Sequence, residues 1–295
     1  MSSTIDNKSQ QTLIIQSLLS RINNNSTNTG TRVTEWSDTP LDTNYPSEKL
    51  VKDTIDNLDL TGGGSSVDIT KIYNESEEGK TFYVDYTNGA DTNDGLTTST
   101  AFKTVGKAWG EIPLLFTKTY TIKIIGDYGT SVDLDKKIGV ASNSSIIITS
   151  NNTSSLSKFT SKFTINGFNT SNSTDGLLIS YLKFSDTGLY LRNIDYVSVK
   201  NMTFDESYGV SYGIYFRNSK GYVENCSFSG ATNNNYGLVY GHMFSDIQSK
   251  NNTYSTNKYG AYVSLNSNIT SIKDTYTNVI TKVSKDNSST HILVE

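Results

Sequence analysis

The chain has 295 residues, of which 18% are charged, and its formal net charge at pH 7 is −4. This small acidic excess excludes the basic surface that nucleic-acid binding requires. Disorder throughout is also excluded, because 19 Tyr and 11 Phe supply large side chains that can fill a narrow core. Asn, Ser, Thr and Gly are abundant and only 3 residues are Pro, a composition that favours β-structure with many tight turns.

The single cysteine, Cys226, cannot form an internal disulfide, and we expect it to be a small buried core residue. Nothing in the chain therefore requires an oxidising compartment. No stretch reaches the length of a transmembrane span, and residues 1–10 lack the basic and apolar regions of a signal peptide. We expect a soluble chain that does not insert into a membrane.

The first expected region, residues 1–30, is a short amphipathic helix followed by a polar connector. Ile15, Leu18 and Ile22 form one apolar stripe at helical spacing. An isolated helix of this length is marginal in water, so we expect it to associate with copies of itself in a short coiled coil. The connector is the polar, turn-rich tract at residues 23–30.

The second region, residues 31–60, has an extended approach containing Trp36 and two prolines, and then a helix that Ser47 can cap. Its apolar residues again form one narrow seam, at Val51, Ile55 and Leu58, so this helix also needs partners. The Gly- and Ser-rich stretch that follows opens a hinge linker at residues 61–80.

Residues 39–52 read T-P-L-D-T-N-Y-P-S-E-K-L-V-K. This segment resembles the T-P-S-D-T-K-Y-P-S-E-K-L-V-K segment near the amino termini of bacteriophage and archaeal-virus tail-fibre and virion-fibre proteins. Leu41 and Asn44 depart from the usual form. The resemblance implies a fibre whose residues 1–60 trimerise and anchor it to a virion, and it implies no activity. The alternative interpretation is a generic helix with a Pro-rich approach.

Residues 81–109 resemble the first segment of pectate-lyase-like solenoids. A strand at 82–85 precedes an Asn/Asp/Gly loop at 88–95, and the phrase T-A-F-K-T then leads into a helix expected near 101–112. Such a helix would cover the open apolar end of the first coil. The residues expected to face the core are Phe102, Val105, Ala108 and Trp109.

An internal repeat follows. Similar short phrases end in an aromatic residue at intervals of 20, 24, 26 and 22, namely at Phe184, Phe204, Phe228, Tyr254 and Tyr276. Glycines open the next phrases in step, at Gly188, Gly213, Gly237 and Gly260. Leucine-rich repeats share this length but not this pattern. The repeat predicts that residues 81–295 form a single-stranded, right-handed parallel β-helix of about eight to nine coils.

Residues at equivalent positions of stacked coils lie above one another, so the repeat predicts two ladders. The recurring aromatic side chains should stack in the interior. Asn201, Asn225 and Asn251, each three residues before an aromatic, could form an amide ladder at a corner.

Viral β-helix spikes are often glycan depolymerases, so the resemblance directs attention to paired acids. A glycosidase needs two carboxylates about 5–10 Å apart. The candidates are Asp186, Asp195, Asp205, Glu206 and Glu224. None lies in a motif, and the side chains of neighbouring residues 205 and 206 would point to opposite sides of a strand. We interpret these acids as solvated turn residues and assign no catalytic residue.

Arg192 and Arg217 each follow a coil-opening glycine, which predicts that they share a face of successive coils. A structural salt bridge is favoured for them over contact with an anion or sugar. Tyrosines and amides near residues 208–215 and 233–240 suit carbohydrate, because aromatic faces stack on sugars and amides bond hydroxyls. The candidate ligand-binding residues are Tyr208, Tyr212, Arg192, Arg217, Asn235 and Tyr236.

No metal site or cofactor is expected. His242 and His291 have no second His or Cys at metal-ligand spacing. The segment Asp91–Gly95 resembles a calcium loop faintly, but its glycine is one place early and the bidentate Glu is missing, so a turn is favoured.

These observations predict a mainly β chain, a β-helix on a short trimeric coiled-coil stalk. The expected function is that of a virion fibre that binds a host cell-surface glycan. Its expected partners are two further copies of itself, a virion protein bound through residues 1–60, and the glycan. The fibre would assemble in the host cytoplasm and leave on the particle. The alternatives are a polysaccharide depolymerase and a cellular adhesin, and the latter would need export.

Overall fold

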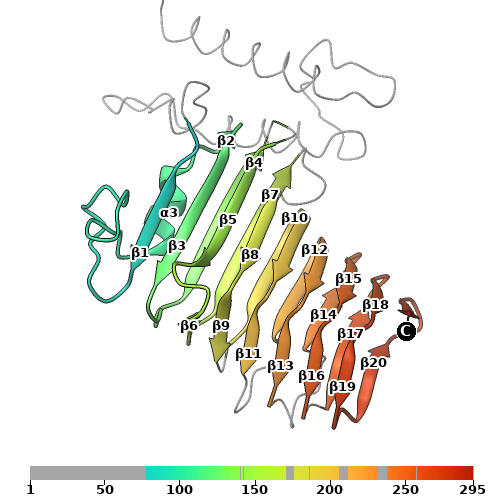
Figure 1. Ribbon diagram of the computed structural model, residues 1–295. Coiled ribbons are helices and arrows are strands. Elements are labelled where there is room, and N and C mark those ends of the chain that lie inside the picture. The colour runs from blue at the N-terminus through green and yellow to red at the C-terminus, as the bar shows by residue number, and fades with distance from the viewer. Residues whose placement is uncertain are drawn as a thin grey trace, which may run out of the picture. The chain divides into compact units, whose positions relative to one another are not determined.

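The computed structural model describes residues 78–294 except 140, 142, 171–175, 186, 206–211, 231–237 and 257. The expected stalk, residues 1–60, and nearly all of the hinge therefore lie outside the described residues. The described part is mainly β and forms a parallel β-solenoid, which confirms the coarse fold (Figure 1). None of its helices is long and apolar enough to cross a membrane.

The solenoid has three faces, each a stack of parallel strands. The first face consists of β1 (Thr81–Asp85), β3 (Thr119–Ile125), β5 (Ser145–Ser150), β8 (Leu177–Ser180), the ends of β10 (Leu189–Lys200) and β12 (Ile214–Glu224), β15 (Asp246–Lys250), β18 (Asn268–Ile272) and β21 (Thr290–Val294). The second face consists of β2 (Leu115–Phe116), β4 (Val132–Gly139), β7 (Phe163–Thr170), the starts of β10 and β12, β14 (Val239–His242), β17 (Tyr259–Ser264) and β20 (Thr281–Lys285). The third face consists of β6 (Ser157–Phe159), β9 (Leu182–Ser185), β11 (Thr203–Asp205), β13 (Ser227–Ser229), β16 (Thr253–Ser255) and β19 (Thr275–Thr277).

Strands β10 and β12 run from the second face onto the first. Their pairing shifts register between Ile194 and Val197, where the chain turns the corner between the two faces. A local register shift of this kind bends a strand without ending it. One long strand can therefore serve two faces.

The solenoid has about six turns, fewer than the eight to nine expected from length and period. The third face accounts for the difference, because its sheet holds six strands and begins only at β6. Before β6, a single bridge between Tyr128 and Phe159 occupies that side. The chain from residue 86 to residue 114 forms a loop and a helix, and so adds no complete turn.

The expected aromatic ladder is present inside the third face. The rings of Phe184 and Phe204 are stacked with centroids 5.4 Å apart, those of Phe204 and Phe228 4.8 Å apart, and those of Phe228 and Tyr254 4.9 Å apart. Tyr276 continues the ladder at 4.9 Å. At the other end the stack extends to Phe159, which lies 5.3 Å from Phe184. The repeat therefore indicated the interior position correctly.

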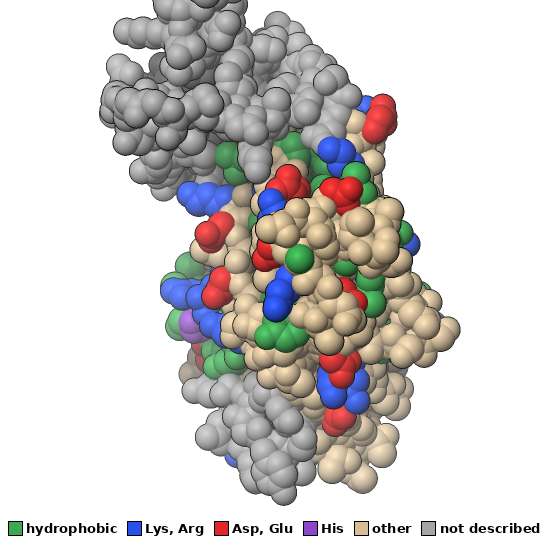
Figure 2. Space-filling view, turned by 90° about the vertical axis from the view of Figure 1, so that its left-hand side faces the viewer, with side chains coloured by type: hydrophobic (Ala, Val, Ile, Leu, Met, Phe, Trp, Pro, Cys, Tyr) green, Lys and Arg blue, Asp and Glu red, His purple; other side chains and the backbone are tan. Residues whose placement is uncertain are grey.

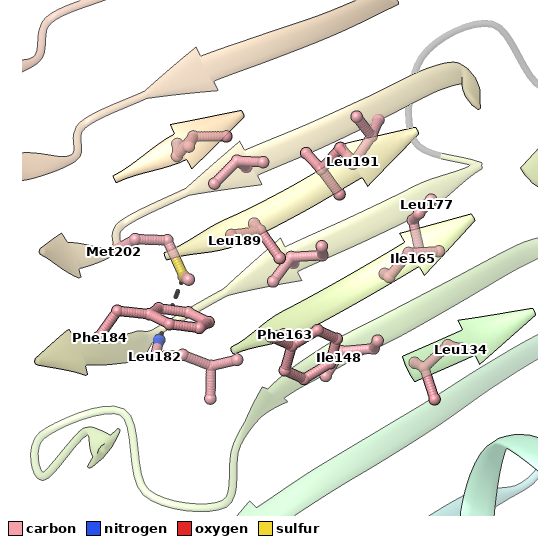
Figure 3. Close-up of a cluster of buried hydrophobic side chains, with 14 of the residues drawn as sticks. Leu134, Ile148, Phe163, Ile165, Leu177, Leu182, Phe184, Leu189, Leu191 and Met202 are labelled. Atoms are coloured by element: carbon pink, nitrogen blue, oxygen red, sulfur yellow. Dashed lines mark hydrogen bonds between the residues drawn. The ribbon is translucent and has the colours of Figure 1, made fainter. Parts of the chain in front are cut away.

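Aliphatic side chains from the first and second faces pack against this ladder. Figure 3 shows Ile148 and Leu177 of the first face and Ile165 and Leu189 of the second among the buried side chains. The fit depends on residue size, because a Cβ at Gly221 would lie 2.2 Å from a ring carbon of Phe216. The interior accepts that ring only because this strand position carries no side chain.

The glycine register needs one correction. Gly213 aligns with Leu238 and not with Gly237, since Ile214 pairs with Val239 and the amide of Ile214 donates to the carbonyl of Leu238. Gly237 itself lies outside the described residues. The spacing of the glycines along the sequence did not give the alignment of the strands, because the loop before β14 differs in length from the loop before β12.

The expected corner ladder of Asn201, Asn225 and Asn251 does not form, and no side-chain bond joins these three described amides. Each has a φ of 54–55°, a left-handed conformation that Asn tolerates, so they turn the chain from the first face to the third. An amide ladder exists elsewhere and is exposed. The Asn193 amide donates to Asn166 at 2.9 Å, and the Asn218 amide donates to Asn193 at 3.1 Å.

Helix α3 (Val105–Glu111) lies within the range 101–112 expected for a capping helix and buries Val105, Ala108 and Trp109. Its amino terminus is capped by Thr104, whose hydroxyl accepts from the amide of Lys107 at 3.1 Å. The Trp109 indole donates to the carbonyl of Asp135 at 2.7 Å, which attaches the helix to β4. The three buried side chains belong to the same apolar core as β1, β3 and the aromatic ladder.

A second interior ladder is formed by the residue two places before each aromatic of the first ladder, namely Leu182, Met202, Cys226, Asn252 and Asp274. Its side chains become more polar along the chain. In three rungs the side chain accepts from the backbone amide of the preceding rung. The Met202 sulfur accepts from Leu182 at 3.3 Å, Asn252 from Cys226 at 2.8 Å, and Asp274 from Asn252 at 2.8 Å. These bonds satisfy amides that would otherwise be buried without partners. Cys226 is buried, and burial raises the pKa of its thiol to about 12.

Asp274 should make stability depend on pH. Burial raises its pKa above 3.8, although hydrogen bonds from Ser249 and Asn252 act in the opposite direction. The unfolded chain therefore ionises first, and the stability due to this group is lost as pH rises from 3.8 through the raised value. We expect the advantage of the wild type over Asp274→Asn in urea unfolding to shrink across this interval. An unchanged difference between the two proteins would contradict the assignment.

Candidate functional site: the outer side of the second face

The described acids that the sequence offered as catalytic candidates do not form a pair. Asp205 lies on the third face, bound to Lys183 at 3.1 Å, and Glu224 lies on the first face, bound to Lys250 at 3.5 Å. Asp195 is exposed in β10. Two carboxylates on different faces cannot flank one glycosidic bond. The other candidates, Asp186 and Glu206, lie outside the described residues.

The loop at Asp91–Gly95 is a hydrogen-bonded turn. The Asp91 carboxylate accepts from the amides of Lys103 and Thr104 at 2.9 and 2.8 Å, which joins this loop to the start of α3. The Asp94 carboxylate accepts from the Thr100 hydroxyl and the Leu96 amide, and these bonds lower its pKa. No group of three His, Cys, Asp or Glu suited to a metal occurs among the described residues.

An aromatic row runs along the outer side of the second face. Consecutive strands place Tyr190, Tyr215, Tyr240 and Tyr262 in register, so that each ring lies beside the next. The ring centroids of neighbouring members are 5.9, 5.3 and 5.2 Å apart. We call these four residues the tyrosine row. Cross-strand aromatic pairs stabilise a sheet by themselves, and an outward row of four also offers a surface on which a ligand can stack.

Tyr212 adds a fifth ring to the tyrosine row. Its ring stacks on Tyr240 at 4.8 Å and lies 5.0 Å from Tyr215. Tyr240 is consequently only 6% exposed, while Tyr190, Tyr212, Tyr215 and Tyr262 are half-buried. The result is a firm aromatic surface whose members support one another and remain partly open to solvent.

A polar row lies two residues further along each strand. It runs from Asn166 through Arg192, Arg217 and His242 to Ser264, again in register. Alternation along the strand puts this row on the same outer side as the tyrosine row. We call these five residues the arginine row. The prediction that the two arginines share a face of successive turns is confirmed.

The salt bridge expected for these arginines is not present among the described residues. Among the described residues neither guanidinium has a carboxylate partner, and the ion pairs found all involve lysine. The Arg192 Nε is buried without a hydrogen-bond partner, and the Arg217 Nε meets only the sulfur of Met243, at 3.3 Å. The residues in register on either side of the pair, Asn166 and His242, are neutral and offer no carboxylate.

Tyr240 of the tyrosine row is joined to His242 and Ser264 of the arginine row, and the three side chains form a closed hydrogen-bonded triangle. The Tyr240 hydroxyl lies 2.8 Å from the Ser264 hydroxyl and 3.0 Å from the His242 Nδ1, which is also 3.0 Å from the Ser264 hydroxyl. Burial lowers the pKa of His242, and the charge of Arg217 lowers it further. His242 is therefore neutral at pH 7 and orients its neighbours without adding charge.

The outer side of the second face combines aromatic surface, two guanidinium groups and exposed amides. On the face seen in Figure 2, acidic and basic side chains are interspersed among uncharged ones. The combination of aromatic faces with planar hydrogen-bond donors suits binding of a polar ring compound. Two carboxylates also lie on this side, since Asp133 and Asp135 are exposed two residues apart in β4 and Asp135 is in register with Asn166.

The structure brings together three of the predicted ligand-binding residues, Tyr212, Arg192 and Arg217. Tyr208, Asn235 and Tyr236 lie outside the described residues. The sequence interpretation missed the tyrosine row and His242. A signal existed, because residues 190, 215 and 240 follow one another at intervals of 25, the pitch of the coil.

Comparison of the chain with protein-family models, with curated proteins and with solved structures gives no match.

Proposed function

We propose that this chain is a virion fibre or spike protein whose right-handed β-helix binds a glycan on the host cell surface. The observation that carries the binding proposal is the tyrosine row: a continuous, outward aromatic surface spanning four consecutive strands, β10, β12, β14 and β17. Exposed rings supported by neighbouring rings give stacking surface at little cost in side-chain entropy. The exposed amides of Asn166, Asn193 and Asn218 are suited to bond sugar hydroxyls.

The fibre part of the proposal rests on the resemblance of residues 39–52 to virion-fibre segments and on the two narrow apolar seams in residues 1–60. We infer that these residues form a trimeric coiled-coil stalk and bind a virion protein. Three copies would place three weak sugar sites on one particle attachment point, and avidity would raise the overall affinity. The mass of the purified full chain in solution tests this, and a monomer at micromolar concentration would oppose the stalk.

Removing rings from the tyrosine row should weaken glycan binding in steps. We expect Tyr215→Ala to lower affinity about 3- to 10-fold, as loss of one aromatic contact of about 0.5–1.5 kcal/mol implies. Tyr215→Phe should retain most of the affinity because it keeps the ring. The measurement is binding of the full chain to an array of immobilised cell-surface oligosaccharides, followed by titration of the best ligand.

The matched control is Tyr222→Ala, which removes a half-buried tyrosine from the first face. Equal losses in the Tyr215 and Tyr222 variants would place binding elsewhere. The same samples should be assayed for reducing ends, because release of sugar fragments would favour the depolymerase alternative over simple attachment.

A further inference from the structure

The arginine row contains a charge arrangement that folding alone does not explain. Arg192 and Arg217 are directly adjacent in register on neighbouring parallel strands, where the spacing is about 4.8 Å. Like charges placed opposite one another in a sheet are destabilising. In a chain with a net charge of −4, acids are more numerous than bases, yet none among the described residues pairs with either arginine.

The surroundings of this pair favour an incoming anion. The Arg192 Nε is buried and lacks a partner, so its N–H is already desolvated and gains a full hydrogen bond from any acceptor that reaches it. Arg217 is exposed, so the pair is accessible from solvent. The residues in register on either side of the pair, Asn166 and His242, are an amide and an imidazole that is neutral at pH 7, and the acid Asp135 follows only beyond Asn166.

The tyrosine row lies beside this pair. Tyr190 and Tyr215 stand two residues before Arg192 and Arg217 in the same two strands. Burial raises the pKa of Tyr215, and the charges of Arg217 and Arg192 act in the opposite direction. A ligand that covers the two rows must therefore present a ring and an anionic group side by side.

We propose, resting on the glycan-binding function above, that the ligand is an acidic saccharide whose carboxylate or sulfate group binds Arg192 and Arg217. Its sugar ring packs against Tyr190 and Tyr215. The guanidinium fork matches a planar carboxylate or two sulfate oxygens, which lysine cannot reproduce. Charge provides the selection among sugars and the rings provide the contact area.

The test compares three polymers binding to the immobilised full chain: polygalacturonate with carboxylates, heparin with sulfates as well as carboxylates, and neutral dextran. We expect at least one acidic polymer to bind and dextran to bind far more weakly. Arg217→Gln should lower affinity for that polymer about 10- to 100-fold, because it removes charge-assisted hydrogen bonds. Arg192→Lys should lower it less, since it keeps the charge and loses only the fork.

Lys183→Gln is the matched control, because it removes one positive charge from the third face and should leave affinity unchanged. Polyglutamate, an acidic polymer without sugar rings, separates saccharide recognition from attraction to any polyanion. Equal, Arg217-dependent binding of polyglutamate would overturn the saccharide assignment. Binding of dextran that Arg217→Gln does not weaken would overturn the acidic ligand and leave glycan binding intact. Failure of every polymer to bind in a Tyr215-dependent way would overturn both.

Discussion

Replacing Phe228 with alanine is expected to lower the free energy of unfolding by about 3–5 kcal/mol. The ring is fully buried and lies between two others, with centroids 4.8 Å from Phe204 and 4.9 Å from Tyr254. Its removal leaves a cavity and interrupts the ladder, because rigid strands on both sides cannot close the gap. Urea unfolding followed by circular dichroism measures the change.

Phe244 provides the matched control, since it is the same residue type and is 65% exposed. Phe244→Ala should change stability by no more than about 0.5 kcal/mol. Phe228→Leu should cost less than Phe228→Ala, because it refills part of the cavity. If the two alanine variants lost equal stability, the ladder would not be the central support of the solenoid.

Replacing Trp109 with alanine is also expected to lower the free energy of unfolding by about 3–5 kcal/mol. The loss arises from the capping helix α3 and not from the stacked turns. The indole is 5% exposed and joins the apolar core at the end where the strands begin. Its N–H bond to the carbonyl of Asp135 is the contact from α3 to β4 that substitution removes directly. Loss of the cap would expose apolar surface and strand edges, so we also expect aggregation during heating.

Trp109→Phe separates packing from hydrogen bonding. It keeps most of the apolar volume but leaves the Asp135 carbonyl without its partner, so we expect a smaller loss of about 1–3 kcal/mol. Lys103→Ala, an exposed change near the start of the same helix, should have little effect. A Trp109→Ala protein as stable and as soluble as the wild type would show that α3 is not needed as a cap.

The interior could be predicted from the sequence because stacked turns repeat the same contact at nearly constant separation. An aromatic such as Phe204 recurs one coil later, as Phe228, and both must occupy the same layer if the strands are in register. The position of the capping helix was expected from the resemblance of residues 81–109 to the first segment of pectate-lyase-like solenoids. The coil count was too high because the chain around α3 belongs to the solenoid without forming a complete turn.

The candidate site was less predictable because direction and register cannot be read from spacing alone. Tyr190 and Leu191 are neighbours in one strand, and Tyr190 faces outward while Leu191 faces inward. Which of the two faces inward depends on where the chain turns from one face of the solenoid to the next. The Asn251 amide was expected in a ladder, but its backbone turns the corner. The described neighbour of Arg217 in register, His242, lies a whole turn away in the chain, so its lack of charge could not be related to Arg217 from spacing alone.

Each turn of this solenoid contacts only the turns before and after it, so nothing closes the stack into a ring. Inserting or deleting one unit of the repeat outside β10–β17 would change the length of the solenoid by about 4.8 Å and leave the tyrosine and arginine rows intact. Length and recognition are thus separable properties in this architecture. Chains of this kind with more or fewer turns would differ in length and share the same tyrosine and arginine rows.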